Sequence, residues 1–346
     1  MSLELLHVTN GDSTGRTLGQ TALGGDVLPW RDVLHEGPLR AGARAGFLEA
    51  RAAFLAAAGW GAPGSLLAAL RERDEALLGA LVAGRPVVLW FEHDLYDQLQ
   101  LLDVLALVRA AAVPCGALEL IQVGSFPGRP GFRGLGELTA SELESLWPQR
   151  VRVTDALLAE AAAVWADVCA ADPRGLARRA DAPVEGLPFL TTALGRLLEE
   201  LPELQDGLSR TERQLLRVLA DGPRPSSASF LASQELEDVP FHGDSWVFRA
   251  LWELGRGEPR LLETASGEPV PEPRDGAPPG NGELALTSLG RAVLAGTADR
   301  VERLGIDRFV GGTHVTSDAV WRWDAAQRAL VPPPQSSGRA ATGTDL

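Results

Sequence analysis

Short apolar runs alternate with stretches of helical spacing along the first third of the chain. Residues 86–91, Pro-Val-Val-Leu-Trp-Phe, form a continuous apolar run, which is typical of a strand buried on both faces of a parallel sheet. Strands that alternate with helices predict an α/β domain with a doubly wound, Rossmann-like parallel sheet. The other predicted strands are 3–8, 26–28 and 118–123, and the predicted helices are 14–23, 43–58, 65–83 and 95–112.

The pattern after the predicted sheet is helical and then mixed. Residues 139–205 have helical spacing, with clear helices at 155–171 and 187–201, and form either a bridge or a cap on the sheet. Ser209 and Glu212 form a capping box that opens a further helix. Two more helices follow, at 226–236 and 244–254, and then two short strands, at 261–264 and 283–286. Three helices and a hairpin are the elements of a winged helix.

These patterns divide the chain into four predicted parts. We predict an α/β domain over 1–138, a helical bridge over 139–207 and a winged-helix-like domain over 208–316. Residues 266–282 are rich in Pro, Gly and Glu and predict a disordered hairpin tip. A disordered tail is predicted over 332–346 on the same grounds.

Composition narrows the class of protein. A chain of 346 residues can bury a large core without disulfides or metals. Cys115 and Cys169 lie in apolar surroundings without metal-binding spacing, which indicates buried thiols in a reducing compartment. The first residues lack the pattern of a signal peptide, and no apolar run is long enough to span a bilayer. We therefore expect a cytoplasmic protein of bacterial type without a membrane partner.

The charge of the chain disfavours nucleic acid as a partner without excluding it. There are 46 acidic and 32 basic residues, a formal net charge of −14, and every basic residue is arginine. Such a balance repels phosphate backbones at long range. The helix predicted at 244–254 is mostly apolar, whereas a helix that reads DNA needs several exposed polar side chains.

The first of three polar clusters follows the first predicted strand. It consists of Asn10, Gly11, Asp12 and Ser13, where glycine permits a tight turn and the following amides open a helix that favours an anion. Asn10, Gly11 and Ser13 are predicted to bind a ligand, and Asp12 is a candidate for acid/base or metal-binding work. The alternative is that Asp12 or Ser13 only caps the next helix.

The second cluster lies in the loop after the strand predicted at 26–28. Arg31 and Asp32 are predicted to bind a ligand, because an arginine beside carboxylates can clamp a carboxylate or phosphate group. His35 and Glu36 are candidates for catalytic proton transfer. The alternative is a surface loop with a local ion pair.

The third cluster directly follows the most apolar strand. Glu92, His93, Asp94, Asp97 and Gln98 lie where a parallel strand ends, the edge at which open α/β sheets bind ligands. Ionisable groups so close to a buried strand are costly without a partner, which favours a functional role. Asp97, His93 and Asp94 are the catalytic candidates here, and Glu92 and Gln98 the ligand-binding ones.

Three of the five histidines, His7, His35 and His93, lie in or beside these clusters. Together with neighbouring carboxylates they could bind a divalent metal, but their spacing matches no metal motif, so we predict none. His7 lies inside the first strand, where bonding to a backbone carbonyl is the commoner role. The sequence assigns no cofactor.

The same segments carry a resemblance to a known family. The motifs LHVTNGDS, RDVLHEGP and WFEHDLYDQ, with the distal FHGD and DRFVGG, resemble the bacterial family catalogued as domain of unknown function 1835. The resemblance covers residues 1 to about 315 and implies an N-terminal domain joined to a C-terminal helical one. It also implies importance for Gly11-Asp12-Ser13 and for Asp97-Gln98, and a more variable position at His93.

Three hypotheses about function follow. In the first, the N-terminal domain binds a small polar or phosphorylated ligand, such as a nucleotide, with hydrolysis or group transfer as the chemistry of any enzyme built on it. In the second, the protein is a regulator whose winged helix contacts DNA or, more in keeping with the charge, a protein partner or a second copy. In the third, the polar clusters bond to one another and are purely structural.

Overall fold

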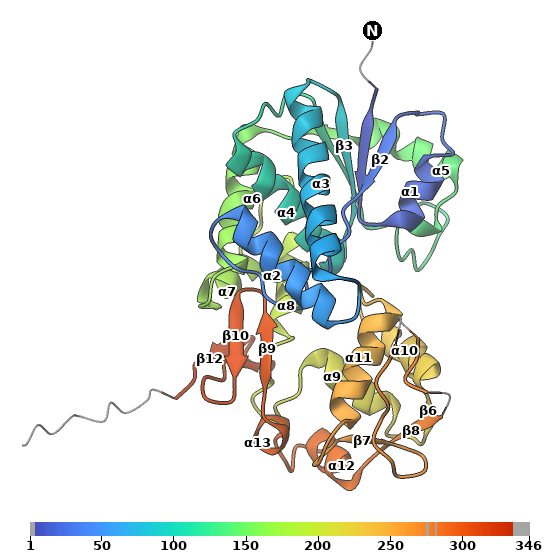
Figure 1. Ribbon diagram of the computed structural model, residues 1–346, viewed down its shortest axis with the longest axis vertical. Coiled ribbons are helices and arrows are strands. Elements are labelled where there is room, and N and C mark those ends of the chain that lie inside the picture. Colours follow the sequence, from blue (N-terminus) through green and yellow to red (C-terminus); the bar gives the residue numbers. More distant parts are fainter. Residues whose placement is uncertain (1–3, 275–276, 281, 335–346) are drawn as a thin grey trace, which may run out of the picture.

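The fold is built on a five-stranded mixed sheet. The computed structural model describes residues 4–274, 277–280 and 282–334. The strands run in the order β2-β1-β3-β4-β5, and the first four are parallel (Figure 1). The α/β class is confirmed, but the sheet is not wholly parallel, because β5 runs antiparallel to β4. The strands are β1 (Leu6–Thr9), β2 (Asp26–Pro29), β3 (Val87–Glu92), β4 (Leu118–Val123) and β5 (Val151–Arg152).

Helices cover both faces of the sheet, as the apolar strand pattern predicts. Val87, Leu89 and Phe91 of β3 join the core under one set of helices, while Val88 and Trp90 join the core on the other face. The first set contains α2 (Arg44–Ala57), α3 (Pro63–Val82) and α4 (Leu95–Ala111), and the second contains α1 (Asp12–Leu18) and α5 (Ala140–Leu146).

The segment predicted as a helical bridge packs as a cover on the sheet domain. Its helices are α6 (Asp155–Val168), α7 (Arg174–Ala180) and α8 (Leu190–Leu198), and they lie outside α4 (Figure 1). Leu158, Val164 and Leu194 belong to the same apolar core as Leu89. We call residues 4–201 the sheet lobe. Within it lie the short turns η1 (Leu135–Glu137) and η2 (Trp147–Gln149).

Residues 208–298 form a second lobe with its own apolar core, which we call the C-terminal lobe. The predicted capping box is present, since Glu212 N donates to Ser209 Oγ at 3.2 Å and Ser209 N donates to Glu212 Oε2 at 2.9 Å. Its three strands pair antiparallel in the order β6-β8-β7. The elements are α9 (Arg210–Val218), β6 (Arg224–Pro225), α10 (Ser226–Gln234), α11 (Asp244–Gly255), β7 (Leu262–Thr264), β8 (Glu283–Leu286) and α12 (Ser288–Leu294).

Part of the segment predicted as a disordered hairpin tip is packed. Val270 is 2% exposed, joins the core of the C-terminal lobe, and donates its N–H to Gly255 O at 3.0 Å. One apolar residue thus anchors the Pro- and Gly-rich loop. Residues 275–276 and 281 of that segment, and 335–346 of the predicted tail, lie outside the described residues.

The chain then returns to the sheet lobe through two hairpins that the sequence pattern did not predict. Gly311 and Gly312 form the turn of the first hairpin, and a Cβ at Gly312 would lie 2.0 Å from Cys169 O. Glycine is therefore required for this close approach. The elements are α13 (Arg300–Leu304), β9 (Asp307–Val310), β10 (Thr313–Thr316), β11 (Arg322–Asp324) and β12 (Ala329–Val331).

Aromatic side chains join the two lobes. Trp246 of α11 stacks on Phe54 of α2, with ring centroids 5.4 Å apart and an interplanar angle of 2°. His35 lies edge-on to Phe241 at 5.1 Å. Within the described part of the chain, none of the helices combines the length and the apolar character needed to span a bilayer.

Candidate functional site

The candidate site lies at the carboxyl ends of β1 and β3. The chain leaves β1 toward β2 on one side and later returns to β3 on the other, so the strand order switches at this point. Ligands of open α/β sheets bind outside the carboxyl ends of strands at such a switch. The loops that follow these strands, residues 10–11 and 93–94, lead into α1 and α4, and the first and third predicted polar clusters lie in and around them.

Asn10 connects the two loops. Its Nδ2 donates to Asp97 Oδ2 at 2.7 Å and, at the longer distance of 3.4 Å, to Glu92 Oε1. The hydroxyl of Tyr96 donates to Asn10 O at 3.4 Å. The first and third polar clusters are therefore one site.

Three carboxylates are buried together behind Asn10. Glu92, Asp94 and Asp97 are 4%, 6% and 0% exposed, and each offers an oxygen within 4.8 Å of the others. Burial, reinforced by the charge of Asp94, raises the pKa of Glu92 to about 8, and burial raises the pKa of Asp94 to about 7. Burial and the two neighbouring carboxylates raise the pKa of Asp97 well above its usual range. We call these three residues the carboxylate cluster.

Backbone amides hold the carboxylate cluster in place. Leu135 N donates to Glu92 Oε1 at 2.6 Å, Glu92 N donates to Asp97 Oδ1 at 2.7 Å, and Asp97 N donates to Asp94 Oδ1 at 2.9 Å. The last bond makes Asp94 the N-cap of α4. Among the described residues no arginine or histidine forms an ion pair with any of the three. A proton or a divalent cation could balance this charge, so the cluster is the place where a metal could bind.

A shallow, open depression of about 350 Å³, lined mostly by polar residues, lies over this arrangement, and we call it the polar cavity. Glu92 is the member of the carboxylate cluster that lines it, together with Tyr96 and the loop after β1. Arg133 and Gly134 come from the segment before η1, which closes the far wall. A Cβ at Gly134 would lie 2.2 Å from Glu92 Oε2, so glycine leaves room for that carboxylate.

A larger apolar cavity of about 820 Å³ adjoins the polar one. The two share Gly11, Asp12 and Tyr96 in their walls. Arg31 lines the larger cavity and binds Asp12 through two nitrogens, one of which is Nε at 3.0 Å from Oδ2. The guanidinium of Arg31 lowers the pKa of Asp12. The apolar walls are Leu28, Val33, Leu55, Leu66, Leu70 and Trp60.

The predicted ligand-binding residues fall into two groups. Asn10, Ser13 and Glu92 line the polar cavity, and Arg31 lines the larger one. Gly11 and the catalytic candidate Asp12 line both. Gln98 needs correction, because it is 0% exposed and its Nε2 donates to Glu92 O at 2.6 Å. Its amide fixes the end of β3 and is not offered to a ligand.

Asp32 also needs correction. Its side chain is 0% exposed and is bound by Arg51, whose Nη2 lies 2.6 Å from Asp32 Oδ1. The guanidinium also donates to Val33 O at 2.9 Å and to Glu36 O at 2.6 Å. Asp32 is among the residues that line the larger cavity, but its carboxylate is turned to Arg51 and fixes the loop after β2 from inside.

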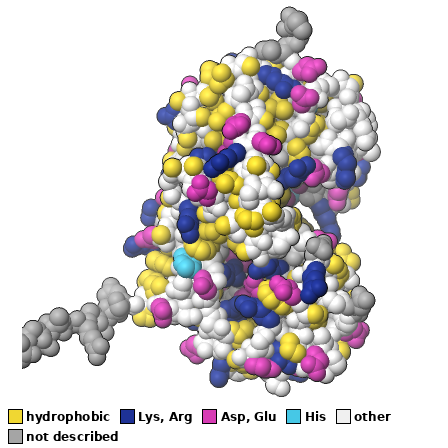
Figure 2. Space-filling view, in the orientation of Figure 1, with side chains coloured by type: hydrophobic (Ala, Val, Ile, Leu, Met, Phe, Trp, Pro, Cys, Tyr) yellow, Lys and Arg dark blue, Asp and Glu magenta, His cyan; other side chains and the backbone are white. Residues whose placement is uncertain are grey.

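His35 and Glu36 are not brought to the carboxylate cluster. His35 is buried among Tyr96, Phe241 and His242, and burial lowers its pKa well below the usual value. Glu36 lines a different cavity of about 750 Å³ between the lobes, where burial raises its pKa to about 7. Figure 2 shows this hollow, with acidic and arginine side chains gathered in it. The predicted catalytic roles of both residues at the shared site are therefore corrected.

His93 and His7 are also separate from the cavities. The ring of His93 packs against Phe189 at a centroid distance of 5.8 Å, and His93 lines neither cavity. This corrects its predicted catalytic role. His7 binds Gly24 O at 2.9 Å through Nε2 and accepts from Trp90 Nε1 at 3.0 Å, so the expected core role is confirmed.

Sequence reasoning missed two contributors to the site. Tyr96 lies within the third motif, but its place between the two cavities depends on how α4 meets β1. Residues 133–137 come from a loop that carries no recognised motif. The spacing of Glu92, Asp94 and Asp97 is visible in the sequence, but the metal site suggested there combines the three histidines with neighbouring carboxylates, not these three carboxylates alone. No known family model matches the chain, and no curated protein matches it.

Proposed function

We propose that the carboxyl edge of the sheet binds a small phosphorylated ligand, with a nucleotide as the class that fits best. The observation that carries the proposal is the junction of a polar cavity at the carboxylate cluster with an apolar cavity, both at the β1/β3 switch. An aromatic or apolar ring fits the larger cavity. The charged group of the ligand then lies toward Asp12, Arg31 and Glu92.

In this proposal a divalent cation neutralises the carboxylate cluster. Carboxylate oxygens are the ligands that Mg²⁺ and Mn²⁺ prefer, and Mg²⁺ is commonly held by one or two carboxylates together with substrate phosphates. Glu92 lines the polar cavity, so a cation on its free oxygen would meet the phosphate there. The chemistry that such a site supports is hydrolysis or group transfer.

A thermal-shift titration with MgCl2, MnCl2 and ATP tests the proposal. We expect the ATP-induced shift of the wild-type protein to depend on the metal and to disappear in Glu92→Gln and Asp97→Asn. Asp26→Asn is the matched control, since Asp26 is an exposed carboxylate at the opposite, amino end of β2. A metal-dependent shift that survives both cluster substitutions would overturn the proposal.

The second candidate function is regulation through the C-terminal lobe. The order α9, β6, α10, α11, β7, β8, with strands paired as β6-β8-β7, supports a winged-helix interpretation. In that interpretation α11 is the helix that would enter a DNA groove, yet its Trp246 is stacked on Phe54 of the sheet lobe. This contact favours protein docking over DNA binding. A gel-shift titration at low and moderate salt tests it, and salt-dependent DNA binding would favour the DNA version.

Two further expectations remain proposals. We infer a cytoplasmic location from the two free cysteines, one of them buried. We also propose the relationship to the family catalogued as domain of unknown function 1835. Its support is that the motif residues Asn10, Asp12, Ser13 and Glu92 gather around one cavity.

A further inference from the structure

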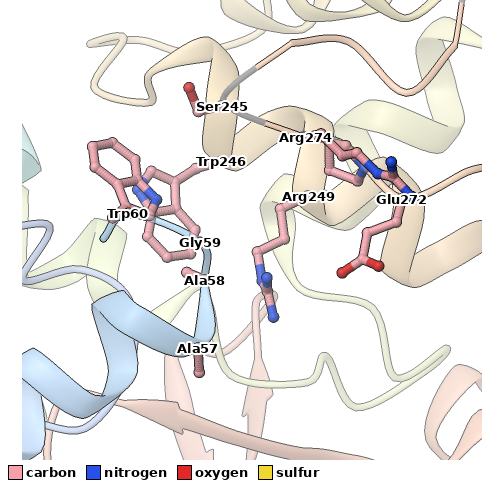
Figure 3. A pocket seen from close by; sticks show the side chains of 10 residues that line it. Ala57, Ala58, Gly59, Trp60, Ser245, Trp246, Arg249, Glu272 and Arg274 are labelled. Atoms are coloured by element: carbon pink, nitrogen blue, oxygen red, sulfur yellow. The ribbon is translucent and has the colours of Figure 1, made fainter. Parts of the chain in front are cut away.

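A separate cavity of about 500 Å³ lies between the two lobes. One wall is the end of α2 and the loop after it, residues 57–60 of the sheet lobe. The opposite wall is the first two turns of α11 and residues 272–274 of the loop between β7 and β8 (Figure 3). Its volume lies within the range of small-molecule sites.

The aromatic wall of this cavity has an exposed tryptophan. Trp60 is 50% exposed, and its ring centroid lies 6.1 Å from that of Trp246 with an interplanar angle of 17°. Trp246 in turn stacks on Phe54, so the three rings form one stacked layer. Such a layer can hold a planar ring, because bases stack on aromatic side chains with little dependence on sequence.

Trp246 supplies an independent sign of a missing partner. It is 7% exposed, lines the cavity, and its Nε1 donates to no acceptor among the described residues. A buried indole N–H normally finds an acceptor, since leaving it unpaired costs free energy. The nitrogen is covered as the ring lies, so a ligand oxygen in the cavity would satisfy it after a small rotation of the indole.

Two arginines lie in the wall of this cavity, although the protein is acidic. Arg249 and Arg274 line it with Glu272 as the single acidic side chain, in a chain of net charge −14. Arg249 pairs with Glu253 at 3.2 Å, one turn further along α11, and Arg274 forms no ion pair with the rest of the described chain. The first-turn amide of Ser245 is bonded to Asp244 Oδ1 at 2.7 Å, so the two arginines are the groups that an anion would meet here.

We infer that this interlobe cavity binds a free nucleotide, with the base against Trp60 and the phosphate between Arg249 and Arg274. The cavity shares Trp60 with the larger cavity at the carboxyl edge of the sheet, but Arg249, Arg274 and Trp246 line no part of the two cavities there. A bound nucleotide would contact both lobes and hold them together.

Calorimetric titration of the full chain with AMP in EDTA tests this inference, since chelation removes any metal-dependent binding at the carboxylate cluster. We expect a Kd at or below about 1 mM. Ribose 5-phosphate, which lacks the base, should bind about tenfold more weakly because base stacking on an aromatic ring is lost. Arg249→Gln and Arg274→Gln should each weaken AMP binding about tenfold, as expected when a charge-assisted hydrogen bond to phosphate is removed.

Two controls separate this site from general electrostatics and from the proposed function. Arg256→Gln removes the same charge near the end of the same helix, outside the cavity, and should change the Kd less than twofold. Asn10→Ala and Glu92→Gln should leave AMP binding in EDTA intact, even if they abolish metal-dependent ATP binding. The inference is overturned by absent binding, by arginine variants that bind like wild type, by equal affinity for ribose 5-phosphate, or by an oligoadenylate that binds more tightly than AMP.

Discussion

Two buried polar regions of the sheet lobe contain the same number of carboxylates but differ in their partners. Beneath α2, α3 and α4, Asp32 is paired with Arg51, and Asp74 and Asp103 are paired with Arg44 and Arg73. We call this region the arginine network. In the carboxylate cluster at the edge of the sheet, three carboxylates meet no arginine among the described residues.

The difference shows in the pKa values. Burial raises the pKa of Asp103, but Arg44 and Arg73 more than offset this, so its pKa lies below the usual value. In the carboxylate cluster burial prevails, and the pKa of Glu92 rises to about 8. Buried carboxylates that are paired with arginines have their charge balanced within the fold, whereas an unbalanced set is typical of a site that receives a ligand.

The largest expected effect is on the arginine network. Arg51→Met leaves Asp32 buried without a cation, and breaking a buried pair in this way costs about 3–5 kcal/mol of unfolding free energy. Urea denaturation followed by circular dichroism measures it. The double variant Asp32→Leu/Arg51→Met should recover much of the loss, because no charge then remains buried. A loss below about 1 kcal/mol for Arg51→Met would remove the contrast between the two regions.

The second prediction concerns the carboxylate cluster and pH. In the folded protein the carboxyl group of Glu92 stays protonated up to about pH 8, whereas in the unfolded chain it loses its proton near pH 4.5. The folded state therefore binds more protons in this window, and the free energy of unfolding in EDTA should fall as pH rises from about 4.5 to 8. Each unit of pKa shift corresponds to about 1.4 kcal/mol.

Glu92→Gln should flatten this dependence and be more stable than the wild-type protein at pH 8. Urea denaturation at several pH values measures the slope, with Asp26→Asn as the control that leaves it unchanged. Adding Mg²⁺ should also flatten the slope, because a cation replaces the proton. A wild-type slope that Glu92→Gln leaves intact would show that the cluster is balanced in a way similar to the arginine network.

A third prediction concerns the buried histidines between the lobes. Their effect on the pH dependence of stability has the opposite sign to that of Glu92. Burial lowers the pKa of His242 to about 4, against an ordinary value of 6.5 in the unfolded chain. Below pH 6.5 the unfolded chain binds the extra proton, so stability should fall as pH decreases from about 6.5 to 4. His242→Phe should reduce this acid sensitivity in thermal melts. If His242→Phe loses stability toward low pH as much as the wild-type protein does, other groups cause the acid sensitivity.

The sequence predicts the elements well and the partners of individual side chains poorly. The run at 86–91 becomes β3, and the strand predicted at 118–123 is β4, because periodicity reports burial directly. Nothing local distinguishes Asp32, which turns inward to Arg51, from Arg31, which turns outward to Asp12. The direction in which each side chain points depends on where α2 packs, and the position of α2 depends on contacts throughout the sheet lobe.

The same limit applies to the site. The convergence of Asn10 with Asp97 follows from two neighbouring parallel strands, which the alternation of strands and helices indicates. The separation of His35 from this site depends on residues 241–242, which are more than two hundred positions away in the sequence. The short hairpins at 307–316 and 322–331 are stabilised by tertiary contacts and have little periodicity to detect.

The smallest effect on stability is expected at Arg31. The two residues of the Asp12–Arg31 pair are nineteen positions apart, as are those of the Asp32–Arg51 pair. Unlike that buried pair, the side chains of Arg31 and Asp12 are 66% and 55% exposed. Exposed pairs contribute about 0–1 kcal/mol, because water already solvates both charges and ordering two side chains costs entropy. Arg31→Ala should therefore change the free energy of unfolding by less than about 1 kcal/mol in urea denaturation.

If the Asp12–Arg31 pair serves a ligand, the same variant should weaken metal-dependent ATP binding about tenfold, since a charge-assisted contact to phosphate is lost. A large stability loss with unchanged ATP binding would move Arg31 into the structural group with Arg51.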